Sequence, residues 1–264
     1  MTDDAVLLDI EGDVATITLN QPDRRNALSE AIGDGLLDAL DEVENADTGA
    51  VVIEGAGDAF SAGGDVDRMF EGLTGDLPLD DRVRILERST CEVMARLYHF
   101  PLPTIAKIDG PAVGAGANLA IACDLQLASD GASFGFVFRQ VGLGVDAGTS
   151  FLLPRLVGLN VAKELVFTGE VFGADRAHDL GLVNHVYPAG ELDAETRALA
   201  ERIARGPSVA FRHTKRLLNE GYEKSFEQAM TDEAVAQGIV FQTDDHEEGV
   251  TAFVEGRDPT FEGR

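Results

Sequence analysis

The chain has 264 residues, of which 47 are Asp or Glu and 21 are Lys or Arg, so its formal net charge is −26. The acids are scattered along the chain, and a surface that is negative on all sides repels nucleic acid and anionic membranes. No apolar run has membrane-spanning length, and the acidic start carries no export signal. We therefore expect a cytoplasmic protein that binds neither nucleic acid nor membrane.

The same charge excess costs stability through self-repulsion, which salt relieves by screening. Only four residues are Lys, and we hypothesise a salt-rich, halophilic cytoplasm, with an ordinary acidic protein as the alternative. Stability should then rise when KCl is added, and a fall in the melting temperature would contradict the hypothesis.

The first 128 residues alternate strands with helices. Strand-like segments are apolar or alternate apolar with polar residues between turn residues: 5–10, 14–19, 50–54, 103–108 and 124–128. Helical segments carry apolar residues at spacings of three and four: 29–45 with Ser29 as its cap, a segment after Asp65, 80–99 and 115–122. Residues 110–116 are expected to form a loop.

The second half is mostly helical. After a strand at 133–135, one short strand is expected at 182–186, and three helices close the chain at 208–219, 225–239 and 244–255. We expect an α/β core over residues 1–200 and an α-helical part over residues 201–264.

The two cysteines, Cys91 and Cys123, lie among apolar residues and are expected to be buried free thiols in a reducing compartment. A catalytic thiol would need a partner base, and the sequence offers none. The five His residues show no ligand spacing, so no metal site is expected.

Two glycine-rich segments each follow a predicted strand and open a helix: 59–66 (AFSAGGDV) and 109–120 (DGPAVGAGANLA). Free amides at a helix N-terminus carry partial positive charge, and small residues let a ligand approach them. Two converging amides would form an oxyanion hole, worth about 3–4 kcal/mol per donor. Tight turns and close packing would require the same glycines, and spacing alone leaves both interpretations open. Neither segment is a P-loop or a dinucleotide motif.

The order of segments resembles the enoyl-CoA hydratase/isomerase (crotonase) superfamily over nearly the whole chain. The motifs that carry the resemblance are 19–28 (LNQPDRRNAL), 60–66, 108–124, 152–158 (LLPRLVG), 174–186 and 253–261. The resemblance implies a spiral core of repeated ββα turns and a C-terminal helical part used for trimerisation, giving a homotrimer or a dimer of trimers. It also implies an acyl-CoA substrate and no separate cofactor, since coenzyme A is part of the substrate.

By that resemblance, the amides of Gly64 and Ala115 hold the thioester oxygen. Four residues would line the coenzyme A groove, largely through backbone groups: Ala27, Ala62, Asp65 and Val66. Arg25 is a candidate contact to the phosphates, although a solvated surface arginine fits its position equally well. Phe261 and Arg264 could contact the adenine or a phosphate.

Hydratases of this family use two glutamates to add water across a conjugated double bond. At the corresponding places this chain has Asn118 and Phe138, and an apolar ring cannot activate water. Both residues are candidate substrate contacts. Asn118 would orient the substrate or a water molecule, or it is a plain polar residue of the helix.

A different acid, Asp146, precedes the predicted helix 147–157, where a helix cap is the commoner role on sequence alone. Some superfamily members have a catalytic aspartate here. One is the ring-epoxide phenylacetyl-CoA isomerase (oxepin-CoA forming), whose 114–117 (GAGA), 146–148 (DAG) and 248–253 (EGVTAF) segments this chain resembles. Another is the chlorobenzoyl-CoA dehalogenase, which ranks low because its His near position 95 and its Trp are absent.

The expected function is therefore a double-bond shift in an acyl-CoA, with Asp146 as the single base of an enoyl-CoA isomerase type and a ring-derived acyl group as one candidate. Apolar neighbours would raise its pKa. The alternatives are an enoyl-CoA hydratase of fatty-acid breakdown that uses Asp146 alone, and a non-catalytic acyl-CoA-binding protein of the same fold.

Overall fold

The computed structural model describes residues 4–65, 69–70 and 78–264. Its framework is a six-stranded sheet in the order β1-β2-β3-β4-β6-β9, parallel except for the β1–β2 hairpin. Its strands are β1 (Val6–Glu11), β2 (Val14–Leu19), β3 (Ala50–Gly55), β4 (Thr104–Ile108), β6 (Leu125–Ser129) and β9 (His185–Tyr187). A small second sheet has the order β5-β7-β8, with β5 (Pro111–Val113), β7 (Ser133–Gly135) and β8 (Val171–Gly173).

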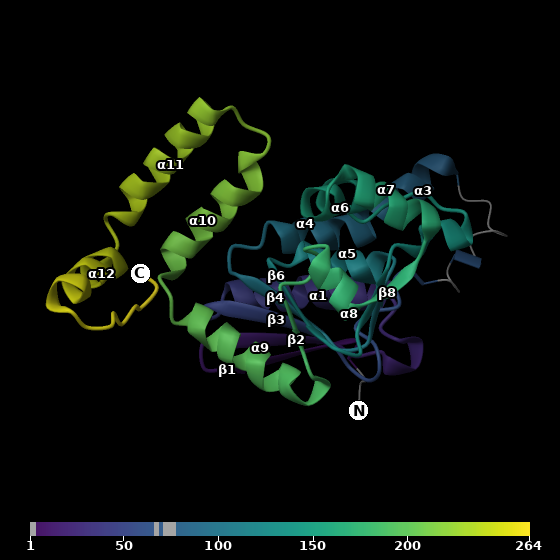
Figure 1. Ribbon diagram of the computed structural model, residues 1–264, viewed down its shortest axis with the longest axis horizontal. Coiled ribbons are helices and arrows are strands. Elements are labelled where there is room, and N and C mark those ends of the chain that lie inside the picture. Colours follow the sequence, from purple (N-terminus) through teal and green to yellow (C-terminus); the bar gives the residue numbers. More distant parts are fainter. Residues whose placement is uncertain (1–3, 66–68, 71–77) are drawn as a thin grey trace.

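Helices cover both faces of the large sheet (Figure 1). On one face lie α1 (Glu30–Glu44), α4 (Glu92–Tyr98) and α5 (Ala115–Ala122), and on the other lies α9 (Ala189–Ala204). The remaining helical elements are η1 (Pro22–Arg24), α3 (Leu79–Leu86), the π-helical η2 (Glu87–Cys91), η3 (Val137–Val141), α6 (Thr149–Val157), α7 (Leu159–Thr168), α8 (Ala174–Asp179), α10 (Ser208–Gly221), α11 (Phe226–Val240) and α12 (Asp244–Glu255).

Strand periodicity divides the core between the two faces. Successive side chains of a strand point to opposite faces, so Val51 and Ile53 of β3 join the larger cluster with α1 and α5. Val52 between them packs in a smaller cluster with Ile105 of β4 and Leu192 of α9. Because both faces are covered, the central strands are apolar throughout, as buried parallel strands usually are.

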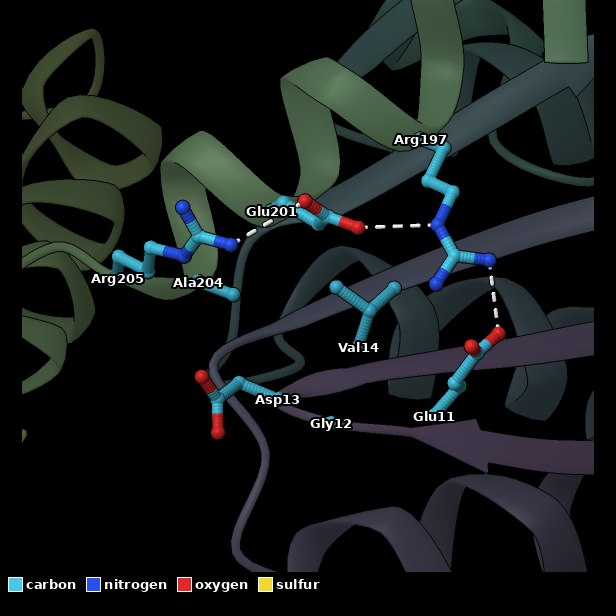
Figure 2. A pocket seen from close by; sticks show the side chains of 8 residues that line it. All are labelled: Glu11, Gly12, Asp13, Val14, Arg197, Glu201, Ala204 and Arg205. Carbon is cyan, nitrogen blue, oxygen red and sulfur yellow. Dashed lines mark hydrogen bonds and ion pairs between the residues drawn. The ribbon is translucent and has the colours of Figure 1, made fainter. Parts of the chain in front are cut away.

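Helix α9 is also held to the β1–β2 hairpin by ion pairs (Figure 2). Arg197 donates to Glu11 of the hairpin at 2.7 Å and to Glu201 of its own helix at 2.9 Å, and Arg205 contacts Glu201 at 3.3 Å. The shallow hollow in Figure 2 is therefore lined by cations that already have carboxylate partners.

Helices α10, α11 and α12 extend away from the body as an arm (Figure 1). A single lysine ties its first helix to the core, because Lys215 contacts Asp124 at 2.7 Å and donates to the carbonyl of Leu102. Tyr98 and Asn219 add two reciprocal hydrogen bonds between side chains and backbone carbonyls. The C-terminal tail turns back onto the arm, where Asp245 accepts from the amides of Glu262 and Gly263.

The expected α/β core and the three terminal helices are present, and three local expectations were wrong. The strand placed at 182–186 lies at 185–187, because Leu182 and Val183 are buried without joining the ladder. The expected loop 110–116 contains strand β5, and β8 is a further short strand in the second half. Cys123 is buried as expected, but Cys91 is exposed.

Two further expectations stay predictions. Most of the helix expected after Asp65 falls outside the described residues. The division at residue 200 into a core and a helical part stays a prediction. Within the described part of the chain, no helix combines the length and apolar character that a bilayer crossing requires.

Replacing Lys215 by Met should destabilise the protein by leaving Asp124 without its cation. Breaking a buried pair costs about 3–5 kcal/mol and an exposed pair about 0–1 kcal/mol. Lys215 is nearly buried but the Asp124 side chain is 26% exposed and keeps two hydrogen bonds from Thr104, so we expect a loss of about 1–3 kcal/mol. The free energy of unfolding in denaturant would measure the loss. The control is Lys163→Met, at an exposed position of α7, which should change stability by about 0.5 kcal/mol or less. Equal effects of the two changes would contradict the anchoring role.

Candidate active site

The two glycine-rich segments lie side by side, because they follow the neighbouring parallel strands β3 and β4 at the same edge of the sheet. Two main-chain hydrogen bonds join them. The amide of Ser61 donates to the carbonyl of Pro111 at 3.1 Å, and the amide of Val113 donates to the carbonyl of Ser61 at 3.0 Å. The contact is a short parallel bridge between Ser61 and Ala112.

The segments approach so closely that side chains would not fit between them. A Cβ added to Gly116 would lie 2.4 Å from the carbonyl oxygen of Ser61. A Cβ added to Gly63 would lie 2.5 Å from the carbonyl oxygen of Val113 and 3.1 Å from the amide nitrogen of Ala115. Gly63 therefore packs directly against Ala115, and Gly64 follows it in the chain.

The amides of Gly64 and Ala115 make no hydrogen bond to any residue in the described ranges. Ala115 is the first residue of α5, so its amide is one of the free donors at a helix N-terminus. Gly114 before it adopts a φ of 55° and donates to the carbonyl of Gly135 at 2.7 Å, which fixes the entry to the helix. Ala115 is buried and Gly64 is half-buried. Both are donors that a ligand oxygen could satisfy.

A third loop, residues 20–28, is attached to the first. The fully buried Asn26 donates to the carbonyls of Ala56 and Ala59 at 2.9 and 2.8 Å, and its side-chain oxygen accepts from the amide of Gln21. Arg25 and Asn26 both have left-handed backbone angles, with φ of 49° and 53°. The sequence analysis did not single out Asn26. The signal for Asn26 in the sequence was a polar residue type that tolerates positive φ, placed inside a turn.

The residues expected to line a coenzyme A groove take part in the same attachment. The amide of Ala62 donates to the carbonyl of Arg25 at 2.8 Å, and the amide of Ala27 donates to the carbonyl of Arg24 at 3.1 Å. Asp65 forms a 2.8 Å ion pair with Arg24. Arg25 is exposed. Val66 lies outside the described residues.

The other candidate contacts lie apart from these loops. Arg264 pairs with Asp244 at 3.5 Å and with Glu262, all on the arm. Phe261 lies against Gly249 of α12, where an added Cβ would be 3.5 Å from its ring. Within this single chain the structure does not bring Phe261 or Arg264 to the glycine-rich loops.

Asp146 lies in the turn before α6, and its side chain does not cap that helix. The N-cap residue is Gly148, without a side-chain cap, so the helix-cap interpretation of Asp146 was wrong. The Oδ1 atom is buried and has no hydrogen-bond partner among the described residues. Burial raises the pKa of this carboxyl, and a backbone hydrogen bond opposes the rise only in part.

Asn118 connects Asp146 to helix α5. Its side chain is fully buried and donates to the hydroxyl of Thr149 at 2.6 Å and to the main-chain carbonyl of Asp146 at 3.3 Å. Asn118 lies three residues after Ala115, so the two share a face of the helix. The helix that carries the free Ala115 amide thus also holds the Asp146 turn. Thr149 was not foreseen, and its spacing of three from Asp146 was the available signal.

The two aromatic residues that follow strand β7 supply no second acid. Phe138 is 6% exposed and Phe136 is fully buried, so the second position where the family's hydratases have a glutamate is apolar. Cys91 is exposed by surface area, but partial desolvation of its thiol, followed by the charges of Asp146 and Glu87, raises its pKa. Cys91 is therefore within electrostatic range of Asp146, yet it is held mainly as a neutral thiol.

Comparison with known proteins gives the family. The family model for enoyl-CoA hydratase/isomerase matches residues 9–264. A Thermus thermophilus protein with an enoyl-CoA hydratase name is 41% identical over 257 residues, covering 95% of this chain and 98% of its own. The 1,2-epoxyphenylacetyl-CoA isomerase of Escherichia coli is 32% identical over 260 residues and 98% of both chains.

Solved structures agree with this assignment. An enoyl-CoA hydratase from Bacillus anthracis superposes with a TM-score of 0.91 at 32% identity, covering 98% of this chain and 100% of that one. Hydratase is the commoner word in the names of similar proteins, and isomerases occur among them. The chain belongs to the enoyl-CoA hydratase/isomerase family and has the crotonase fold.

Burial of the Asp146 carboxylate should destabilise the folded protein when the group is ionised, whereas an uncharged Asn at this position should not. An acid whose pKa is raised by folding costs nothing below the ordinary Asp pKa of about 3.9, where it is protonated in both states, and costs most above its folded-state pKa. Asp146→Asn should therefore melt above the parent protein near neutral pH, and the difference should shrink as the pH approaches about 4. Thermal unfolding in high salt would measure it, with Asp38→Asn, an exposed acid of α1, as the control. A lower melting temperature of Asp146→Asn at neutral pH would contradict the desolvation argument.

Proposed function

We propose that this member of the enoyl-CoA hydratase/isomerase family binds an acyl-CoA thioester and shifts a double bond by proton transfer through Asp146. In this proposal the amides of Gly64 and Ala115 bind the thioester oxygen. The observation that carries it is the unpartnered carboxylate oxygen of Asp146, on a turn fastened by Asn118 to the helix that begins with the free Ala115 amide.

The mechanism follows from these donors and this acceptor. Two backbone N–H groups facing the thioester oxygen stabilise the negative charge that grows there when a proton leaves the neighbouring carbon. Asp146, with a raised pKa, removes that proton as a carboxylate and then, as a carboxylic acid, returns it to another carbon of the conjugated system. The net result is an isomer of the substrate, with no water added and the carboxylate regenerated.

We favour isomerisation over hydration because the site has a base for proton transfer, whereas Phe138 replaces the second group that would hold a water molecule. A hydratase must hold and deprotonate a water molecule, and Phe138 offers no acceptor for that purpose. Asn118 is engaged through its amide nitrogen in holding Thr149 and the Asp146 carbonyl. Asp146 is then the one carboxylate we assign to the chemistry. A ring-derived acyl group is one candidate for the substrate of this proposed isomerase.

The second candidate is an enoyl-CoA hydratase that uses Asp146 alone. The names of the relatives favour it, since most of them are hydratases. The 1,2-epoxyphenylacetyl-CoA isomerase and the trans-2-decenoyl-[acyl-carrier-protein] isomerase among them favour the first candidate. A non-catalytic acyl-CoA-binding protein is the remaining alternative, and the retention of a desolvated acid beside the donor loops argues against it.

We also propose that the protein assembles as a trimer or a dimer of trimers through its arm. The arm exposes large apolar side chains that a partner could cover: Leu218, Tyr222, Phe226, Phe253 and Val254. Such a contact would bring the arm of one copy to another copy, where Phe261 or Arg264 could contact coenzyme A. A cytoplasmic, salt-rich setting remains part of the proposal, resting on the net charge.

Asp146→Asn should abolish turnover while acyl-CoA binding persists. Loss of a general base costs about 10²–10⁴-fold in kcat, whereas the oxyanion donors are untouched. The assay supplies a 3-enoyl-CoA and crotonyl-CoA in parallel in high salt and follows the absorbance of the conjugated thioester. A rise with the first substrate indicates isomerisation, and a fall with the second indicates hydration.

In the parent protein the rate should rise with pH through an apparent pKa above the ordinary Asp value of about 3.9, because the base acts in its ionised form. Calorimetric titration with a CoA thioester would show that the variant still binds. Full activity of Asp146→Asn would refute the assignment of the base. Crotonyl-CoA consumption without any isomerisation would favour the hydratase.

A further inference from the structure

The turn that carries Asp146 has an unusual backbone conformation. No side-chain cap of helix α6 holds it in place. Ala147 has a φ of 49° and Gly148 a φ of 81°, so two successive residues adopt left-handed angles. For Ala this conformation is strained by about 1–2 kcal/mol. A strained turn persists only where its surroundings hold it, and the buried methyl of Ala147 cannot form hydrogen bonds.

Three donors converge on one acceptor in this turn, the main-chain carbonyl of Asp146. They are the amide of Thr149 at 2.9 Å, the hydroxyl of Thr149 at 2.8 Å and the side-chain amide of Asn118 at 3.3 Å. Asn118 also donates to the Thr149 hydroxyl at 2.6 Å, which orients that hydroxyl proton toward the carbonyl. Thr149 and Asn118 are almost entirely buried, so solvent does not compete for these bonds.

The side-chain oxygen of Asn118 has no part in this network. The Oδ1 of Asn118 is buried and has no donor among the described residues, as is true of the Asp146 carboxylate oxygen. An unsatisfied buried acceptor costs about 1–3 kcal/mol, whereas an apolar residue at 118 would avoid that cost. The polar side chain is retained there for its Nδ2 donors, whose acceptors are the Thr149 hydroxyl and the Asp146 carbonyl.

We propose that Thr149 and Asn118 are positioning residues that hold the Asp146 carbonyl and thereby fix the strained turn that presents the carboxylate to the substrate. The inference rests on the proposed role of Asp146 as the base and extends it to two side chains that do not themselves transfer protons. Together with the Thr149 amide they give that carbonyl three donors. They also set the carboxylate in its desolvated position, so loosening the turn would hydrate it.

The test is Thr149→Val, which keeps the size of the side chain and the Thr149 amide but removes the hydroxyl. A base displaced by a fraction of an ångström should lose between about 10- and 100-fold in kcat. KM for the CoA thioester should change little, because the oxyanion donors lie on other elements. The acid limb of the pH–rate profile should move to lower pH, since a more hydrated carboxylate has a pKa nearer its ordinary value. Thr149→Ser, which restores the hydroxyl, should recover most of the lost rate.

Asn118→Leu should produce the same two changes, and the double variant Asn118→Leu/Thr149→Val should be little worse than either single variant because both serve one carbonyl. Ser150→Ala, at the adjacent exposed position, is the matched control for altering α6. Wild-type kcat and an unmoved acid limb in Thr149→Val would overturn the proposal. So would a loss of melting temperature with both kinetic readouts unchanged.

The outcome of Asp146→Asn separates the two levels of inference. If that variant is inactive while Thr149→Val is unaffected, the positioning role fails alone. If Asp146→Asn is active, the proposed base fails, whatever Thr149→Val shows.

Discussion

The site depends on the pair of main-chain hydrogen bonds that joins Ser61 to strand β5. They bring residues 62–65 alongside residues 113–116, and the spacing they impose is too short for a side chain at Gly63 or Gly116. Asn26 attaches the third loop to the same place through its own hydrogen bonds. The donors proposed to bind the substrate are thus main-chain groups on rigid neighbours, so they need no reorganisation when charge develops on the ligand.

The chain that surrounds these main-chain donors carries a large negative charge. The chain carries a net −26, and several of its cations hold elements together: Arg24 with Asp65, Arg197 with Glu11, and Lys215 with Asp124. Phosphates of a CoA ester would approach against this field, and screening by salt would lower the barrier. In the proposed function, backbone dipoles, which bear no net charge, therefore carry recognition of the thioester.

Sequence alone predicted the elements set by periodicity and the segments set by glycine. The hairpin, helix α1, the three terminal helices and the two junctions lie where their patterns placed them, because burial on one or both faces produces a regular spacing of apolar residues. The short strands β5 and β8 were missed although β7, of the same length, was expected, because three residues show too little of a period to decide between strand and loop. Cys91 was misplaced because apolar neighbours on an exposed helix resemble those of a core. Nor could the sequence show that Asn118 contacts Thr149 and the Asp146 carbonyl, since residues 31 and 28 positions apart meet only through tertiary packing.

Asn118 shows how one substitution pattern can redirect a site without changing its fold. At the position where the family's hydratases have a water-handling glutamate, this chain has an amide whose donors are consumed in bracing a turn. A glutamate there would be an acceptor facing a carbonyl and a hydroxyl, and would repel the first. The bracing arrangement and the water-activating arrangement therefore exclude each other at residue 118. In the proposed function the braced turn then supplies the acid. Asp146 suits that role because its Oδ1 is buried without a hydrogen-bond partner among the described residues and burial raises its pKa.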